Sequence, residues 1–458
     1  MIGLAVLALL GPACTSNASA PPAPAPAASP GPVPGTVGDL FGINEAVAIP
    51  QRIVRGEGLA PDQVARHLAR DARAAREVGA RWVRANSASY PFTSWYEARR
   101  APAFRERVDR WVAIVQAEGL DPLLVVGPWP GNRTASYTDA YVPDDLDGYR
   151  AWVRALVERY DGDGADDMPD LRRPIRAWEV DNEPDLHNRV PPRGGRGQVD
   201  PSTFETPDEY ARVLVATADA IRAADPSARV LNGGTFHTAR PWGRAYLERV
   251  LAAPGAAAAV DALSVHAYFE ERTPALFEAA LDNAALLAGG RPVWVTETGV
   301  PSSRRGSSWV DPNFQARMVA FVIGESLARG VERVAWHTLA DPPDEGPGAP
   351  DGPNPYATHS LFRNPGGPAD AALERKPSGD VFARLAAHLG AVGRGDVVRL
   401  DVAGGRAVRA GGLVLVYEGE RVAVPASPGA EVLDLVTGAR IPHAGPVAAP
   451  ALVIPAGG

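Results

Sequence analysis

The sequence has little cysteine, little lysine and no excess of basic residues. Its single cysteine, Cys14, excludes an internal disulfide framework and a zinc site built from several thiolates. The 54 acidic residues outnumber the 46 basic ones, of which only Lys376 is a lysine, and the formal net charge is −8. Without a basic surface to neutralise phosphates, no nucleic acid is expected as a partner.

Motifs of several common enzyme classes are also missing. No HExxH, CxxC or Gly-x-Ser-x-Gly occurs, so zinc proteolysis, dithiol redox chemistry and esterase chemistry of the α/β-hydrolase type have no support. The acidic run 161–167 is similar to the start of a calcium loop, but Arg172 stands where that loop needs a glutamate. We therefore predict a solvated loop here, and neither a metal nor a cofactor.

The N-terminal segment has the composition of an export signal. Residues 2–10 form an apolar run, shorter than the roughly 20 residues that span a bilayer, and small residues and Cys14 follow it. This pattern resembles a bacterial lipoprotein signal, which implies a lipid on Cys14 and a cell-surface location. The alternative is a signal that is cleaved to release a secreted protein. Residues 15–36, almost all Ala, Pro, Ser and Gly, predict a disordered tether after the signal 1–14.

Between residues 37 and 390, short β-type runs alternate with stretches of helical period. Val64, Leu68 and Ala75, for example, share one face of the first helical stretch. Eight βα units predict an α/β protein with a (β/α)₈ TIM barrel, and no Gly-rich phosphate loop follows the first run to favour a doubly wound sheet. The expected strands are 40–43, 81–85, 122–127, 175–180, 228–232, 262–266, 292–296 and 333–337.

The last segment, 391–458, has a different character. Short β-type runs are separated by Gly, Pro and Asp, and no helical period is visible. We expect a small, sandwich-like all-β domain that packs on the barrel, because it is too small to bury much core alone. Its expected strands are 397–400, 413–417, 422–424, 431–436 and 451–454.

Two glutamates stand at ends of expected barrel strands, where the reacting groups of such barrels lie. Glu183 follows the fourth strand in Asn182-Glu183-Pro184, and Glu297 closes the seventh. Two carboxylates that face one bond suit glycoside hydrolysis, in which one donates a proton and the other attacks or stabilises the anomeric centre. Taken singly, each has an ordinary structural explanation: Asn-Glu-Pro is a common turn, and a Glu often caps a strand.

These residues resemble the clan A glycoside hydrolases, which are retaining (β/α)₈ enzymes. Their fourth strand ends in Asn-Glu-Pro with an acid/base Glu, and their seventh ends in the nucleophile, which Glu183 and Glu297 match. The likeness covers the whole barrel and looks most like families 39 and 5. It implies a carbohydrate or glycoside substrate and hydrolysis with retention by a two-glutamate double displacement.

The resemblance also implies roles for substrate-binding residues. Asn182 would bind the sugar 2-hydroxyl, Arg84 would hold the nucleophile, and His266 and Tyr268 would lie beside it. Trp336 would form the floor of the reacting-sugar subsite, and Trp129 belongs to a set of loop aromatics that could stack on sugars. The structural alternatives are a core histidine for His266, a structural ion pair for Arg84 and barrel packing for Trp336.

Three other functions are compatible with the sequence. A barrel that has lost catalysis would only bind carbohydrate at the cell surface, and a transglycosylase would use the same two carboxylates. A purely structural envelope protein would bind no sugar. Turnover of aryl glycosides, product analysis with excess acceptor and sugar binding distinguish them. The sequence predicts neither the sugar nor the oligomeric state.

Overall fold

The computed structural model describes residues 35–44, 60–85, 93–100, 103–128, 141–185, 206–269, 274–302, 311–341, 358–365 and 371–456. The expected signal 1–14, nearly all of the tether 15–36 and Trp129 lie outside the described residues. Among the helices that are described, none combines the length and the apolar character that a membrane span requires.

Eight parallel strands form the predicted barrel. Their order is β5-β4-β3-β2-β1-β8-β7-β6, and a parallel bridge between Leu231 and Ala262 joins the two outer strands β5 and β6 to close the sheet. Each strand starts and ends within two residues of the run expected from the sequence. The strands are β1 Phe41–Asn44, β2 Trp82–Ala85, β3 Asp121–Val126, β4 Ala177–Val180, β5 Arg229–Asn232, β6 Leu263–His266, β7 Val293–Thr298 and β8 Arg333–His337.

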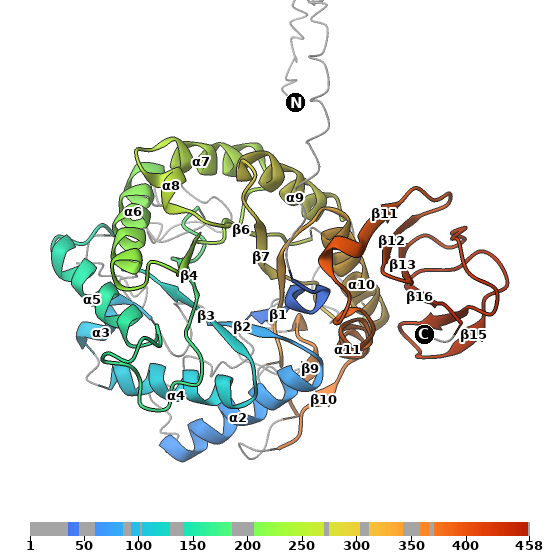
Figure 1. Cartoon of the computed structure of the whole chain (residues 1–458), viewed down its shortest axis with the longest axis horizontal. Coiled ribbons are helices and arrows are strands. Elements are labelled where there is room, and N and C mark those ends of the chain that lie inside the picture. Colours follow the sequence, from blue (N-terminus) through green and yellow to red (C-terminus); the bar gives the residue numbers. More distant parts are fainter. Residues whose placement is uncertain are drawn as a thin grey trace, which may run out of the picture.

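Helices surround the strands as an outer ring (Figure 1). Several begin at a cap that the sequence encodes: Thr206 and Glu209 form a capping box, and the Asp311 side chain accepts the Phe314 N–H. The helices are α2 Pro61–Glu77, α3 Trp95–Arg100, α4 Phe104–Ala117, α5 Leu146–Glu158, α6 Pro207–Ala224, α7 Pro241–Ala252, α8 Ala256–Ala259, α9 Ala275–Ala288, α10 Pro312–Ala328 and α11 Pro377–Leu389.

Alternation along the strands separates two cores. One face of each strand joins the large hydrophobic cluster between strands and helices. The other face fills the barrel, where Trp82 and Trp294 lie with ring centroids 5.7 Å apart. Ala335 of β8 belongs to this inner cluster and its neighbour Trp336 to the outer one. A strand residue can therefore reach the barrel axis only at every second position, unless a bulge intervenes.

The C-terminal strands form a separate antiparallel sheet beside α10 and α11 (Figure 1). Tyr417 packs on Gly324 of α10, where a Cβ would lie 2.3 Å from the tyrosine ring, so only glycine permits this approach. The sheet order is β11-β12-β13-β16-β14-β15, with β11 Val397–Leu400, β12 Arg406–Ala410, β13 Leu413–Glu418, β14 Glu431–Asp434, β15 Arg440–Pro442 and β16 Ala451–Ile454.

The expected strand at 422–424 is wrong, since that segment makes only a single bridge from Val422 to Val447. Two strands of this sheet were not predicted, β12 and β15. In β12, Arg406-Ala407-Val408-Arg409-Ala410, the two arginines and two alanines hide the pattern, because arginine and alanine have little intrinsic preference for strands. Pairing with β11 and β13 on either side determines its conformation instead.

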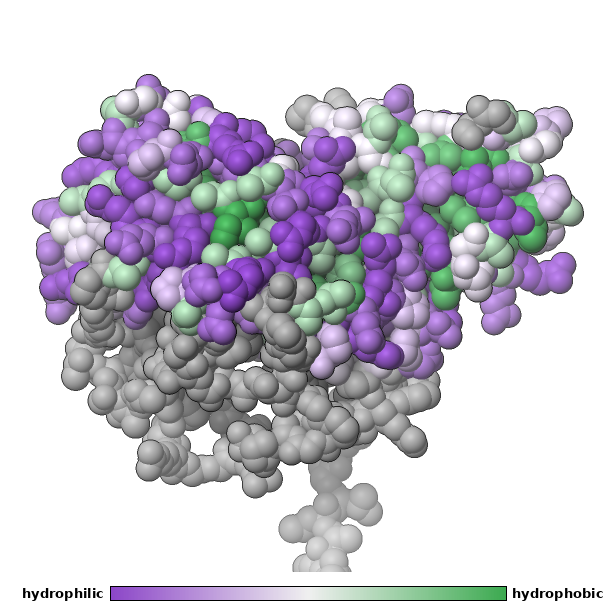
Figure 2. Space-filling model, turned by 90° about the horizontal axis from the view of Figure 1, so that it is seen from below, coloured by the Kyte–Doolittle hydropathy of each residue, from purple (hydrophilic) through white to green (hydrophobic). Residues whose placement is uncertain are grey.

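Hydrophilic residues cover most of the described part of the face in Figure 2, and hydrophobic ones form only small patches. Over the described residues, the exposed large hydrophobic side chains lie on different elements: Trp242, Leu286, Val398 and Ile441.

In the acidic loop 161–167, the Asp163 and Asp167 carboxylates accept backbone N–H groups of the loop itself.

Candidate active site

Two local distortions place the glutamates at the carboxyl end of the barrel. After β4 the chain turns sharply, with positive φ at Asp181 (69°) and Glu183 (49°), and the Glu183 N–H donates to the Gly234 carbonyl. In β7 the register shifts between Val295 and Thr298, so that Glu297 pairs with the inward-facing His266. Strict alternation along β7 would have pointed the residues on either side of Glu297 toward the barrel axis. The bulge turns Glu297 itself toward the axis.

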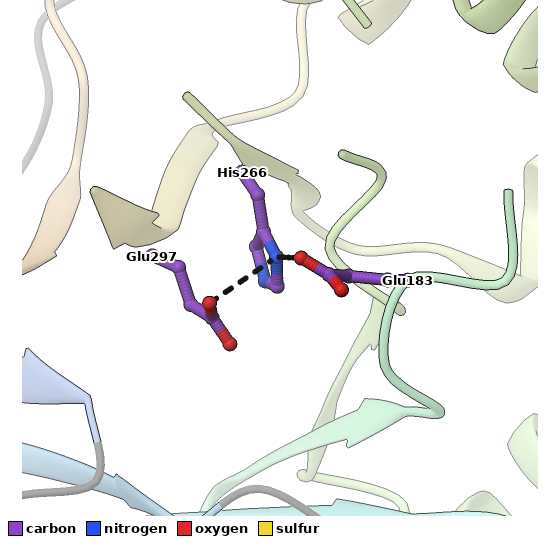
Figure 3. Close-up of side chains that lie close together, drawn as sticks. All are labelled: Glu183, His266 and Glu297. Atoms are coloured by element: carbon purple, nitrogen blue, oxygen red, sulfur yellow. Dashed lines mark hydrogen bonds and ion pairs between the residues drawn. The ribbon is translucent and has the colours of Figure 1, made fainter. Parts of the chain in front are cut away.

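The two carboxylates face each other across His266 (Figure 3). His266 Nδ1 lies 2.7 Å from Oε1 of Glu183 and 3.6 Å from Oε2 of Glu297. One carboxylate oxygen of each glutamate lies within 4.8 Å of the other. The structure thus brings together Glu183, Glu297 and His266 as the sequence predicted, at a spacing that lets both acids reach the same bond.

Glu297 is buried and held at both oxygens. Arg84 Nη1 donates to Oε1 at 2.7 Å, and the Tyr268 hydroxyl donates to Oε2 at 2.8 Å. Burial by itself would raise the pKa of Glu297, but the positive charges of His266 and Arg84, together with the Tyr268 hydrogen bond, lower it to about 2. Burial opposes the charged form of His266, yet the two glutamates raise the pKa of His266 overall. Glu297 is therefore an ionised carboxylate at neutral pH.

The lowered pKa of Glu297 makes a prediction about acid stability. Because folding favours the ionised form of Glu297, this carboxylate stabilises the folded protein at pH values above its ordinary pKa of 4.5. The stabilisation is lost as the pH falls from 4.5 towards 2. The melting temperature of the wild type should therefore drop more between pH 5 and pH 3 than that of Glu297→Gln, which has no carboxylate to titrate. Parallel melting curves for the two proteins over this range would contradict the assignment.

Arg84 connects two buried acids, Glu297 in the site and Glu179 below it. It is fully buried in β2 and donates through Nε to Glu179 and through Nη2 to Asn182 Oδ1 at 2.8 Å, in addition to its bond with Glu297. Glu179 of β4 is also fully buried and accepts from Ser264 and Thr296. Arg84 is therefore the cation that compensates two buried carboxylates, one below the site and one in it.

Removing the Arg84 guanidinium should destabilise the protein strongly. In Arg84→Met, Glu179 loses the cation that pairs with it and Glu297 keeps only His266, which we expect to lower the free energy of unfolding by about 3–5 kcal/mol. Urea denaturation measures this change. The matched control is Arg249→Met, which breaks the exposed pair with Asp208 and should leave the stability nearly unchanged. Similar denaturation midpoints for the two variants would contradict the role of Arg84.

The loop that carries Glu183 is fixed to its neighbour after β5. Asp185 is buried and accepts the backbone N–H groups of Phe236 (2.9 Å) and His237 (2.7 Å). Burial raises the pKa of Asp185 to about 6, although those two hydrogen bonds favour its charged form. Gly234 packs against the ring of His266, where a Cβ would lie 2.2 Å from Nε2. The position of the acid thus depends on two loops together.

The prediction for Trp336 is wrong. Its ring is 1% exposed, belongs to the cluster between strands and helices, and donates its N–H to the His359 carbonyl. The strand register turns it away from the barrel axis, so it packs the core and forms no floor of a sugar subsite. The next residue, His337, faces the axis instead. Trp129 lies outside the described residues.

Sequence reasoning missed three residues of this site: Asn44, Glu179 and His337. Asn44 ends β1 and accepts from Arg84 Nη1 at 2.8 Å, while its amide lies 2.9 Å from His337 Nδ1. All three sit on inward positions of barrel strands. Glu179 could have been found by counting alternate positions along the fourth strand, because it lies in the run Trp178-Glu179-Val180 that leads to the acid/base motif.

The donor atoms of Glu183, His266 and Glu297 are near enough to one another to ligate a metal. However, Arg84 and Tyr268 already donate to both oxygens of Glu297. A guanidinium 2.7 Å from the would-be ligand repels a dication. The arrangement suits proton transfer and nucleophilic attack better than metal binding.

Comparison with protein families relates this barrel to known enzymes. Residues 80–240 match the model of glycoside hydrolase family 44, and residues 180–352 match the model of a glycosyl hydrolase catalytic core. The chain is a TIM-barrel glycoside hydrolase. The second match spans both Glu183 and Glu297. No curated protein matches this glycoside hydrolase.

Solved structures show the same fold. A family 51 α-L-arabinofuranosidase from Bifidobacterium longum has a TM-score of 0.57 at 16% identity, over 93% of this chain and 97% of that one. A glucosidase from Croceicoccus marinus has a TM-score of 0.55 at 17% identity, over 92% and 83%. A family 39 enzyme from Xanthomonas axonopodis pv. citri has 0.53 at 14% identity, over 93% and 98%. The predicted TIM-barrel fold is confirmed, while these matches name several glycoside hydrolase families and select none.

Proposed function

We propose that this glycoside hydrolase cleaves O-glycosidic bonds with retention of configuration, using Glu183 as acid/base and Glu297 as nucleophile. The observation that carries the proposal is the approach of the two carboxylates, whose nearest oxygens lie within 4.8 Å. Retaining glycosidases hold their carboxyl groups about 5–5.5 Å apart, whereas inverting ones leave about 6.5–9.5 Å for a water. The spacing here favours retention.

In the first step Glu297 Oε attacks the anomeric carbon as the bond to the leaving oxygen breaks. Glu183 gives its proton to that oxygen, so the leaving group departs as an alcohol and a glycosyl ester of Glu297 forms. In the second step Glu183 removes a proton from water, and the water oxygen attacks the anomeric carbon. Glu297 leaves as a carboxylate and Glu183 is protonated again.

The surroundings of each glutamate support this division of roles. Glu297, whose pKa is lowered to about 2, is ionised and available for attack, and Tyr268 and Arg84 orient both of its oxygens. Glu183 instead bonds His266, a group that can accept or return a proton. Arg84 holds Asn182 on the loop that carries Glu183, and we assign to Asn182 the binding of a sugar hydroxyl.

A panel of nitrophenyl glycosides tests the proposal. The enzyme is expected to release nitrophenol from at least one glycoside, and NMR of the first-formed sugar should show the anomeric configuration of the substrate. Product of inverted configuration would overturn the mechanism. Saccharide binding without turnover of any glycoside would indicate a carbohydrate-binding protein instead, and transfer to an excess of acceptor alcohol would indicate a transglycosylase.

We further propose that the enzyme is exported and anchored by a lipid on Cys14. The support is the sequence alone: the apolar run 2–10, the small residues before Cys14 and the Pro/Ala-rich tether that follows. Labelled fatty acid should be incorporated into the wild type and not into Cys14→Ser. Equal labelling of both proteins, or none in the wild type, would contradict lipidation, and the location of the Cys14→Ser protein tests export separately.

A further inference from the structure

We propose that His337 binds the glycone of the substrate, donating a hydrogen bond from Nε2 to a sugar hydroxyl in the reacting subsite. This inference rests on the proposed function. It assigns to His337 the inward-facing place at the end of β8 that the sequence had suggested for Trp336, and it makes that wall of the subsite polar.

The placement of His337 follows from the barrel register. In β8, Ala335 belongs to the inner cluster, so His337, two residues on, faces the same way at the open end. His337 pairs with Asn44 of β1, and its ring centroid lies 6.2 Å from that of Tyr268. Because Tyr268 donates to Glu297 at 2.8 Å, the half-buried imidazole borders the space in front of the nucleophile.

Hydrogen bonds at its base determine which imidazole nitrogen carries the proton. The Arg84 guanidinium can only donate, so the Asn44 atom that it contacts at 2.8 Å is the carbonyl oxygen. The other end of that side chain is then the NH₂ group, 2.9 Å from His337 Nδ1. An amide N–H can only donate, so Nδ1 is the acceptor and the neutral ring has its proton on Nε2.

This tautomer leaves a donor at the outer end of the ring. Within the part of the chain that the structure describes, no partner accepts from His337 Nε2. Glu179, Arg84, Asn44 and His337 form a chain of hydrogen bonds from the barrel interior to the site, which holds the ring in one orientation. A fixed donor beside the anomeric centre fits a hydroxylated glycone better than a deoxy sugar.

Substrate and enzyme are changed together to test the proposal. Values of kcat/KM are measured for the best glycoside of the panel and for its monodeoxy glycone analogues, with the wild type, His337→Asn and His337→Gln. Asparagine can still accept from Asn44 but has no donor at the Nε2 position, whereas glutamine places an amide N–H near it. One deoxy analogue should react about 10- to 100-fold more slowly than the parent with the wild type.

That penalty should disappear in His337→Asn and persist in part in His337→Gln. If every deoxy analogue loses the same factor in kcat/KM with His337→Asn as with the wild type, the inference is overturned while the glycosidase function stays intact. Absence of turnover by the wild type would instead be a failure of the proposed function.

¹⁵N NMR of histidine-labelled protein tests the donor without any activity measurement. The resonances of His337 are assigned by their loss in His337→Asn. A proton on Nε2, and a change of the Nε2 signal when the free glycone sugar is added, support the proposal. A proton on Nδ1, or an Nε2 signal that no sugar changes, would overturn it.

Discussion

Glu297→Ala is expected to lower kcat on aryl glycosides by about 10⁴- to 10⁶-fold, because the covalent step loses its attacking oxygen. The vacated space should admit azide, which attacks the anomeric carbon from the side of the missing carboxylate. Azide should therefore restore turnover and yield a glycosyl azide of inverted configuration.

A matched control separates chemistry from folding. Glu248→Ala removes another glutamate, on α7, which pairs with Arg244 on the protein surface. It should keep wild-type kcat. Circular dichroism and the melting temperature check that Glu297→Ala remains folded. Near-normal kcat in a folded Glu297→Ala protein would end the assignment of Glu297 as nucleophile.

The second large effect is expected for Glu183→Ala, and its size should depend on the leaving group. General acid catalysis contributes about 10²- to 10⁴-fold where the departing oxygen needs a proton. The loss in kcat/KM should be of this size for glycosides of phenol or simple alcohols and small for dinitrophenyl glycosides, whose leaving groups depart as stable anions.

The dependence of log kcat/KM on leaving-group pKa measures this directly. A steeper slope for Glu183→Ala than for the wild type is the expected result. Added azide should give a glycosyl azide of retained configuration, since it replaces water in the second step. A uniform loss across all leaving groups would indicate that Glu183 only positions the substrate or the fold.

The positions of the strands could be predicted from the sequence because each is a short apolar run bounded by Gly, Pro or a helical stretch. Glu183 and Glu297 could be predicted because reacting groups of such barrels follow strand ends. Arg84, His266 and Tyr268 were named on the resemblance to clan A, and the structure places all of them at Glu297 or Glu183.

The residues that were predicted wrongly or not at all share a physical cause. Trp336 and His337 differ by one position, and which of them faces the axis depends on the pairing of β8 with β1 and β7, which a single run does not reveal. The bulge that turns Glu297 inward is likewise a property of paired strands. Glu179 is a buried carboxylate whose cation, Arg84, comes from another strand, so its role emerges only when the barrel closes.

Trapping the reaction intermediate tests the two-glutamate mechanism most directly. A 2-deoxy-2-fluoro glycoside with a good leaving group slows both steps, and the covalent ester then accumulates. Mass spectrometry of the intact protein should show one added fluoroglycosyl group, and peptide mapping should place it on Glu297. An added group on any other residue, or inactivation of the enzyme with no added mass, would contradict the mechanism.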